Sequence, residues 1–295
     1  MWKRRSIGDW IFDSINVILL LLVAFVCFYP FWYVFAVSLN DNSVSSYVHV
    51  TFWPEAVTFK NYMSVLSSPL LMNGFFVSFL RVVIGTTLSV LLSSAMAYAL
   101  SRKELVGRTF WNIFILVPMY IGGGLIPTYL LVKSLHLLDT FTILVVGGLF
   151  SSWNIILLRT SFSAMPNELV ESAKLDGAND LQIFIRIVLP CEKAIIATIT
   201  LFVAVALWND WFAGDIYISS NNLKPVQTIM LNIINNAKAA DLAKDMASAT
   251  GQYVGTMVES IKMSTIVLTV FPIVVVYPFL QKYFVKGIMV GSLKG

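Results

Sequence analysis

Long apolar runs alternate with short polar segments along the whole chain of 295 residues. A run of about 20 apolar residues is long enough to cross a bilayer as a helix. The pattern predicts six membrane spans, at about 11–39, 71–100, 110–132, 140–159, 194–213 and 264–283. We therefore expect an all-α integral membrane protein that forms a single domain over 1–295.

The third predicted span differs from the others because it contains helix breakers. Pro118, three glycines at 122–124 and Pro127 interrupt its apolar sequence. A break at membrane depth persists only where protein or a cavity covers the freed backbone groups. We therefore expect 110–132 to be a broken span whose break is covered by protein or by a cavity.

The placement of charge predicts the orientation. The chain has 58% hydrophobic and 12% charged residues, which is too apolar for an ordinary soluble surface. Most of its Lys and Arg residues fall in the segments 1–10, 101–109, 159–193 and 282–295. The positive-inside rule places these segments, and both termini, in the cytoplasm. The net charge of +4 therefore reflects topology, and we expect no nucleic-acid partner.

The segment 165–190 is the only long one on the predicted cytoplasmic side. Pro166 fits the first position of a helix and Asn167 can cap its free N–H groups. Gly177 follows that helix at the point where a left-handed residue is favoured, and Asn179 or Asp180 can cap a second helix. The sequence predicts a helix–turn–helix with a glycine hinge.

The second of these helices has an apolar stripe. Leu181, Phe184, Ile185 and Val188 lie at helical spacing, and Pro190 is expected to end the helix. With the carboxylates of the first helix, this stripe predicts a surface for docking in the cytoplasm. The alternative is an ordinary amphipathic connection between two spans.

The same segment resembles a known motif. Glu171-Ser172-Ala173, then Gly177, then Ile187-Val188-Leu189-Pro190 have the spacing of the EAA loop of ABC-importer permeases. Only Ser172 departs from that pattern, by one small residue for another. The resemblance implies a coupling helix that inserts into a partner ATPase. Its residues would be Glu171, Ser172, Ala173, Asp176, Gly177, Ile187, Leu189 and Pro190.

Further motifs extend the resemblance to nearly the whole chain. They are Gly123-Gly124-Leu125-Ile126-Pro127-Thr128-Tyr129, Trp208-Asn209-Asp210-Trp211, Tyr277-Pro278-Phe279 and Lys282-Tyr283-Phe284-Val285-Lys286-Gly287. They are similar to oligosaccharide permeases of the maltose-permease-like (MalG-like) class and its LplC branch. The resemblance implies a type I ABC-importer permease fold in the bacterial inner membrane. It also implies a second homologous permease, two ATPase subunits, an extracellular solute-binding protein and an oligosaccharide substrate, besides membrane lipid.

No residues for nucleotide or metal chemistry are evident. The sequence contains no G-x-x-x-x-G-K-[ST] phosphate loop, so we expect ATP and Mg²⁺ only in the partner ATPase. Cys27 and Cys191 fall on different elements, and His49 and His136 are isolated. We therefore expect no cofactor, no metal and no catalytic residue in this chain.

Two of the charged residues within the predicted spans, Arg81 and Asp210, need separate treatment. Arg81 lies about ten residues into the second span, and an Arg at that depth costs about 3 kcal/mol on insertion scales. It is expected either to contact an anionic sugar or to form a structural pair with Asp210 or with the partner permease. The first alternative carries the hypothesis that the cargo is an acidic oligosaccharide.

A set of polar and aromatic residues is the candidate substrate pathway. Amides beside aromatic faces suit sugar rings, although Trp also collects at membrane interfaces for other reasons. The predicted residues are Arg81, Trp153, Asn154, Trp208, Asn209 and Asp210.

The sequence thus predicts a permease subunit of an ATP-driven, binding-protein-dependent oligosaccharide importer. The alternative is an ion-coupled secondary transporter, which needs membrane-embedded acids. Apart from Asp13 at the start of the first span, Asp210 is the only acid in the predicted spans, and it lies near one edge. An integral-membrane enzyme is not indicated, because no cluster of His, Asp or Ser is present.

Overall fold

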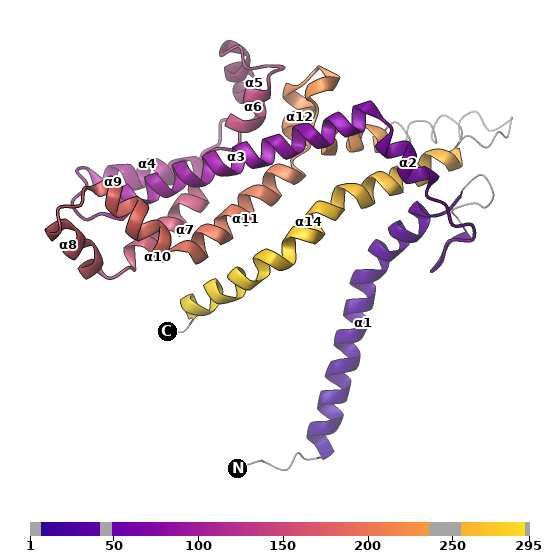
Figure 1. Cartoon of the computed structure of the whole chain (residues 1–295), viewed down its shortest axis with the longest axis horizontal. Helices are drawn as coiled ribbons and strands as arrows, with labels where there is room; N and C mark the ends of the chain where they lie inside the picture. Colours follow the sequence, from indigo (N-terminus) through magenta and orange to yellow (C-terminus); the bar gives the residue numbers. More distant parts are fainter. Residues whose placement is uncertain (1–6, 42–48, 236–254, 293–295) are drawn as a thin grey trace. The chain divides into compact units, whose positions relative to one another are not determined.

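The computed structural model describes residues 7–41, 49–235 and 255–292, and most of these residues are helical (Figure 1). The chain forms two compact units, one of residues 1–68 with 232–270 and the other of residues 69–231 with 271–295. The last helix, α14 (Gly255–Ser292), contributes to both. The all-α prediction is confirmed for the described residues, where the one bridge between extended segments joins Asn40 and Val57.

The first unit contains α1 (Ile7–Ser38), α2 (Lys60–Leu66) and the first part of α14. With 32 residues at 1.5 Å each, α1 is about 48 Å long and crosses the hydrocarbon core with residues to spare. Its apolar side chains are exposed along almost the whole helix. The bounds agree with the predicted span at 11–39.

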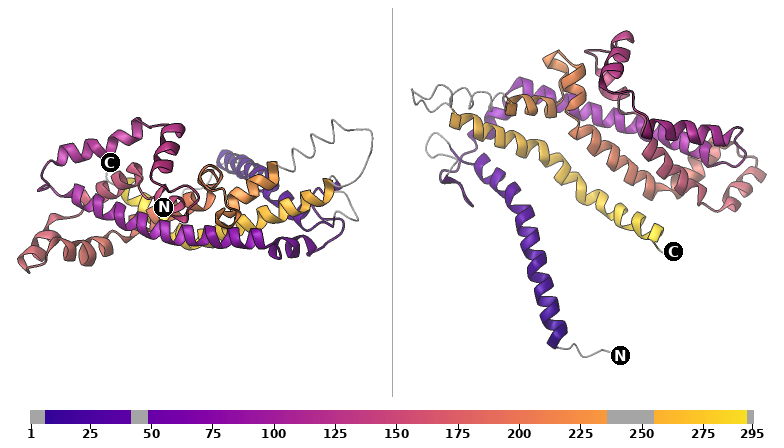
Figure 2. Two further views of the ribbon diagram at one scale, coloured as in Figure 1. Left: turned by 90° about the horizontal axis from the view of Figure 1, so that it is seen from above. Right: turned by 180° about the vertical axis from the view of Figure 1, so that it is seen from behind.

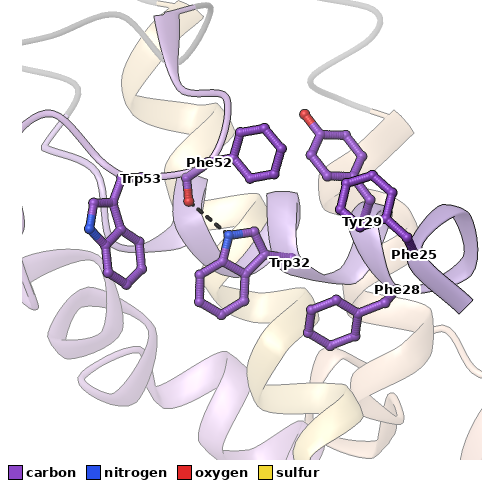
Figure 3. Close-up of a pocket in the computed structure, with 6 residues that line it drawn as sticks. All are labelled: Phe25, Phe28, Tyr29, Trp32, Phe52 and Trp53. Atoms are coloured by element: carbon purple, nitrogen blue, oxygen red, sulfur yellow. Dashed lines mark hydrogen bonds between the residues drawn. The ribbon is translucent and has the colours of Figure 1, made fainter. Parts of the chain in front are cut away.

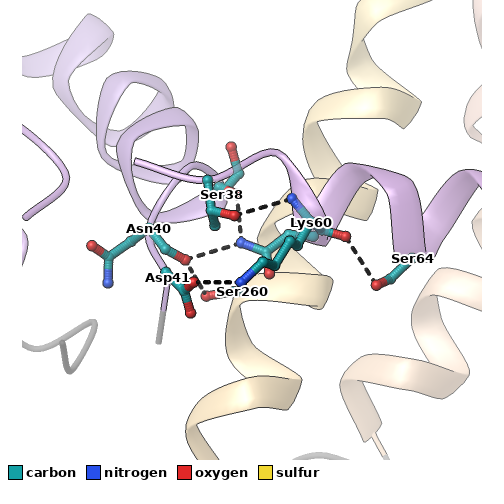
Figure 4. Close-up of polar contacts among 8 residues, drawn as sticks. Ser38, Asn40, Asp41, Lys60, Ser64 and Ser260 are labelled. Atoms are coloured by element: carbon teal, nitrogen blue, oxygen red, sulfur yellow. Dashed lines mark hydrogen bonds and ion pairs between the residues drawn. The ribbon is translucent and has the colours of Figure 1, made fainter. Parts of the chain in front are cut away.

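A buried polar junction holds the end of α1 in this unit (Figure 4). The carbonyl of Asn40 accepts hydrogen bonds from Asn61 Nδ2 at 3.0 Å and from Ser260 Oγ at 3.4 Å. The carbonyl of Ser38 accepts from Asn61 Nδ2 at 2.9 Å and from Ser264 Oγ at 3.1 Å. Buried carbonyls need such partners. The junction therefore fixes α1 against α2 and α14.

An aromatic pocket of about 500 Å³ lies beside α1 (Figure 3). It is lined by Phe25, Phe28, Tyr29, Trp32, Phe52 and Trp53. Trp32 Nε1 donates to the Phe52 carbonyl at 2.7 Å, and Tyr29 Oη donates to the Thr51 carbonyl at 3.3 Å. The polar atoms of both rings are thus occupied by backbone. We interpret the cluster as part of an aromatic belt at a membrane interface.

The second unit is organised around α3 (Pro69–Ser101), which packs against α7 (Ser152–Ser163) and α11 (Lys193–Asn209) (Figures 1 and 2). The close approach of α3 and α11 leaves no room for a side chain at Gly85 unless Leu207 moves. A Cβ at Gly85 would lie 2.7 Å from the Leu207 side chain. Small residues at such contacts are typical of membrane helices.

The third predicted span is broken, as expected. It consists of α4 (Arg108–Tyr120) and α5 (Leu125–Ser134), which meet at 115°. Gly124 is left-handed at the break, with φ +77°. Pro118 stays within α4 and Pro127 within α5, so the glycines, and not the prolines, make the break.

The fourth predicted span is also divided, which the sequence analysis did not anticipate. The region 140–159 contains α6 (Phe141–Val146) and the start of α7, with residues 147–151 between them. Ser151 caps α7 by accepting from the Asn154 N–H at 3.4 Å. Three helices in the described residues are long and apolar enough to span alone, and two bent pairs pass together. The count of six spans stays a prediction.

The region between the last two predicted spans, 214–263, is helical in its first part. It includes most of α12 (Phe212–Tyr217), a 3₁₀ helix over Asn221–Leu223 and a helix over Val226–Asn235. The Val226 N–H donates to Ser78 Oγ at 2.9 Å, and the Ile229 side chain fills the space beside Gly74. This segment therefore packs on α3; residues 236–254 lie outside the described ranges.

Candidate functional site

Arg81 forms a buried ion pair in the middle of the second unit. The side chain is 2% exposed and pairs through Nη2 with Asp210 Oδ2. Its Nη1 donates to the Asp210 carbonyl at 2.9 Å and its Nε to the Leu144 carbonyl at 2.8 Å. All three guanidinium nitrogens are therefore engaged within the chain. This is the structural alternative that the sequence left open for Arg81.

Asp210 joins the ion pair to a helix break. It follows the last residue of α11, and its Oδ1 accepts from the N–H groups of Phe212 at 3.0 Å and Ala213 at 3.2 Å. One carboxylate oxygen thus caps α12 while the other binds Arg81. The side chain remains 33% exposed. Asp210 therefore connects α3 to the α11–α12 break, and still faces open space; Arg81 adds the contact to α6.

That space is a pocket of about 450 Å³. Its lining includes Gly148, Ser151, Trp153, Asn154, Phe202 and Asp210. The residues come from the break between α6 and α7 and from the end of α11. In transporters, discontinuous helices at membrane depth typically surround the substrate path. The pocket is the candidate translocation site.

The structure brings together half of the predicted pathway residues. Trp153, exposed, and Asn154, buried, line the pocket with Asp210. Trp208 is buried and Asn209 is exposed, and neither belongs to the lining. Arg81 acts on the pocket only through Asp210.

The sequence analysis missed Gly148, Ser151 and Phe202. Two glycines at 147–148 followed by two serines at 151–152 were the available signal, because they mark a helix break and then a helix cap.

The predicted helix–turn–helix at 165–190 is present. It begins with α8 (Asn167–Leu175), turns at Gly177 with φ +80°, and continues in α9 (Asp180–Ile183). Asn179 caps α9 in a capping box with Gln182. The prediction for the first cap is wrong: Pro166 occupies the cap position and Asn167 is the first helical residue.

Pro190 does not end the second helix, contrary to the prediction. A π-helix over Phe184–Val188 leads into α10 (Leu189–Cys191), and Leu189 N–H donates to the Phe184 carbonyl five residues earlier. Proline lacks an N–H and its ring clashes with the carbonyl four residues before it. The wider π turn directly before Pro190 relieves that conflict. The chain then bends by 84° into α11.

The apolar stripe of the second helix is divided between two surroundings. Phe184 and Val188 are buried, and the Phe184 ring lies 5.2 Å from the ring of Tyr98 in α3. Leu181 and Ile185 remain 65% and 53% exposed. The predicted docking surface therefore contains only the second pair.

The residues of the EAA-like motif are mostly accessible. Ala173 is buried, and Ile187 and Leu189 are partly buried. The exposed members are Glu171, Ser172, Asp176, Gly177 and Pro190.

A separate polar contact closes the side of the second unit that holds α12. Asp139 Oδ1 accepts from the N–H groups of Ser219 at 3.0 Å and Ser220 at 2.8 Å, and Oδ2 accepts from Ser220 Oγ at 2.5 Å. The Ser220 hydroxyl, and then the backbone N–H groups, hold the pKa of Asp139 below its ordinary value of 3.8. Asp139 thus connects the turn before α6 to the turn after α12.

Comparison with known proteins agrees with this geometry. A family model described as binding-protein-dependent transport system inner membrane component matches residues 89–290. The chain belongs to this family. It is an integral membrane permease subunit of a binding-protein-dependent importer. This membership argues against the alternative of a secondary transporter.

Its relatives match over nearly their full length. The polygalacturonan/rhamnogalacturonan transport system permease protein YtcP of Bacillus subtilis (strain 168) is 38% identical over 97% of this chain and 99% of that protein. Protein LplC of the same strain is 35% identical over 97% and 95%. A chain in the crystal structure of a bacterial ABC transporter involved in the import of the acidic polysaccharide alginate is 29% identical. That chain has a TM-score of 0.85 and covers 96% of this chain and 99% of its own length.

Proposed function

We propose that the chain is one of two permease subunits of an ATP-driven importer for acidic oligosaccharides. A second homologous permease supplies the other half of the pathway, and an extracellular binding protein delivers the cargo. ATP and Mg²⁺ bind to two partner ATPase subunits. The names of the relatives support the class of cargo, since YtcP is named for polygalacturonan and the solved transporter for the acidic polysaccharide alginate.

The observation that carries this proposal is the neutralised pocket beside the α6–α7 break. Among the described residues, Asp210 is the only charged one in its lining, and Arg81 compensates that charge. A bare carboxylate there would repel a uronate in a medium of low dielectric constant. The exposed ring of Trp153 offers a face for a sugar ring, and the amide of Asn154 offers hydrogen bonds.

The coupling step rests on the cytoplasmic helix–turn–helix. Exposed Leu181 and Ile185, with Glu171 and Asp176, form the surface that docks on the ATPase. The π-helix and α10 connect this surface to α11, which ends at the pocket. ATP-driven movement of the loop thereby reaches the pathway and alternates its access.

Uptake measurements with a matched pair of tryptophan variants test the proposal. Trp153→Ala should lower uptake of galacturonate oligosaccharides several-fold in cells that express the complete operon. Trp111→Ala removes an exposed tryptophan of α4 that does not line the pocket, and it should leave uptake unchanged. Equal uptake by both variants, or wild-type preference for neutral oligosaccharides, would refute the assignment of site or cargo.

The orientation is part of the same proposal. We infer that both termini and the segment 165–190 are cytoplasmic. With Cys27 and Cys191 replaced, a single cysteine at Asn179 should be protected from an impermeant reagent added to intact cells. A single cysteine at Asn222 should react. Labelling of position 179 from outside would reverse the orientation and remove the coupling argument.

A further inference from the structure

A second pocket of the same unit lies between the end of α3 and the coupling loop. Its volume is about 420 Å³, and it shares no residue with the pocket at Asp210. Tyr98 and Arg102 line it from α3 and the turn that follows, and Asp180 and Phe184 from the second helix of the loop. Whatever fills this pocket therefore contacts both α3 and the coupling loop.

Two polar groups in this pocket have no hydrogen-bond partner among the described residues. Tyr98 is 7% exposed, and its hydroxyl is buried without a hydrogen bond. The Nε of Arg102 is also buried and unpaired, while its guanidinium lies 4.6 Å from the centroid of the Tyr98 ring. A buried polar group without a partner is costly, and Nε–H can only donate. The pocket therefore calls for a ligand oxygen between these two groups.

The charges around the pocket are balanced and separate. Arg102 and Lys174 are positive and Glu104 and Asp180 are negative, and within the described parts of the chain no ion pair joins any two of them. The pKa of Glu104 lies below its ordinary value because its own backbone N–H bonds the carboxylate and because Lys174 and Arg102 are near. A ligand that bears one charge of each sign complements this arrangement.

The wall of the pocket on α3 is apolar. Ala95 and Ala99 lie one helical turn apart on an exposed face of α3, and both line the pocket. Because α3 crosses the membrane and ends at Ser101, this wall lies where hydrocarbon gives way to water. The ligand is therefore an amphiphile with a polar head beside Arg102 and an apolar part beside the alanines.

We propose that the pocket binds the head group of a zwitterionic phospholipid, phosphatidylethanolamine. Its phosphate oxygens accept hydrogen bonds from Tyr98 Oη and Arg102 Nε, and its ammonium group lies toward Asp180 and Glu104. The apolar part follows Ala95 and Ala99. An anionic lipid brings no positive group to Asp180 and Glu104, which is why the zwitterionic head is favoured. The bound lipid ties α3 to the coupling loop.

Lipid retention tests this proposal without any transport measurement. The full chain, purified with its co-purifying subunits from nanodiscs of phosphatidylethanolamine and phosphatidylglycerol, is washed in detergent and its retained lipid is counted by native mass spectrometry. Wild type should retain phosphatidylethanolamine. Arg102→Gln should lower that retention about tenfold, the value of one charge-assisted hydrogen bond. Lys103→Gln, at an exposed neighbour that does not line the pocket, should retain lipid as wild type does.

A second variant decides the case in which Arg102→Gln fails to assemble. Tyr98→Phe keeps the ring that packs on Phe184 and removes only the unpaired hydroxyl. Loss of phosphatidylethanolamine in Tyr98→Phe supports the site. Unchanged retention in both variants overturns it, as does selective retention of phosphatidylglycerol. Absence of retained lipid in the assembled wild-type complex also overturns the proposal. A protein subunit would then be the group that covers the pocket.

Discussion

Arg81 in α3 and Arg102 directly after it have opposite surroundings. Arg81, near the middle of the second unit, is buried and uses all three guanidinium nitrogens in contacts to Leu144 and Asp210. Arg102, one residue after the end of α3, lies over the ring of Tyr98 with Nε unpaired. The same side chain is thus fully paired near the middle of the unit and only partly paired just beyond the end of α3.

The difference separates fixed geometry from available binding capacity. A buried network in which every member has a partner specifies one arrangement, because any shift leaves an unpaired charge. A partly satisfied group permits a ligand or a neighbour to complete it. We therefore expect the region around Arg81 to behave as a rigid frame for the pocket, and the region around Arg102 to respond to what binds beside the coupling loop.

Breaking the ion pair between Arg81 and Asp210 should have the largest effect on stability. Asp210→Asn leaves the 2% exposed guanidinium of Arg81 without its counter-charge, which should cost about 3–5 kcal/mol of unfolding free energy. Arg81→Met should cost less, because the carboxylate of Asp210 is one-third exposed and water can solvate it. Chemical denaturation in detergent, followed by circular dichroism, measures both.

The double variant is the control for this pair. Arg81→Met with Asp210→Asn removes both charges and keeps an oxygen at position 210 that can cap α12. Its cost should be clearly below the sum of the two single costs, since neither charge is left alone. Simple additivity would mean that the ion pair does not hold the frame together.

A smaller effect on stability is expected at Gly177, the hinge of the coupling loop, on the side of the unit that holds Arg102. A Cβ at Gly177 meets nothing within 4 Å, so its only cost is the left-handed conformation, about 1–2 kcal/mol for Val. Gly177→Val should abolish ATPase activity that depends on cargo-loaded binding protein. Gly177→Asn, which tolerates this conformation better, should retain it.

Gly107→Val is the matched control for strain. Gly107 is also left-handed, with φ +70°, but it lies outside the coupling loop. Val at that position should leave the stimulated activity largely intact. Equal loss in the two valine variants would attribute the effect to folding and not to the hinge.

The smallest effect on stability is expected at Asp139, which separates the contribution of hydrogen bonding from that of burial. Asp139 is fully hydrogen-bonded yet exposed to solvent. Because its pKa is lowered in the folded chain, its contribution to stability is present above the ordinary value of 3.8 and is lost as pH falls through the lower folded value. Asp139→Asn should therefore lower the melting temperature slightly at pH 6, and the difference should shrink as the pH falls below 3.8. A constant difference would exclude the carboxylate as its cause.

The elements that the sequence predicts well are those with a local cause. The span at 71–100 matches α3 within two residues, because an uninterrupted apolar run has no alternative in a membrane. The three glycines at 122–124 produced the expected break. Gly177 adopted the expected left-handed conformation.

The errors have tertiary causes. The stripe at 181–188 was expected on one surface, but Tyr98 from α3 covers Phe184 and the π-helix before Pro190 shifts the register. The helix at 226–235 was missed because its burial depends on Ser78 and Gly74, about 150 residues earlier in the chain. Periodicity records neither which neighbour covers a face nor where a distant helix leaves room.

The reasoning about cargo also changed. Arg81 first suggested an acidic oligosaccharide because its charge had no partner on its own helix. The structure supplies that partner in Asp210, so the cost of burying Arg81 no longer argues for an anionic cargo. Support for that cargo now comes from the relatives and from the neutral pocket that the ion pair leaves.

The polar junction at the end of α1 has a consequence for biosynthesis. The carbonyls of Asn40 and Ser38 each accept one hydrogen bond from Asn61 and one from a serine, 220 and 226 positions later in the chain. The bonds from the serines cannot form until the start of α14 has left the ribosome, whereas most partners within the second unit are already available. During synthesis the end of α1 is therefore held by α2 alone, and a truncated chain that stops before Ser260 never gains the contacts to α14.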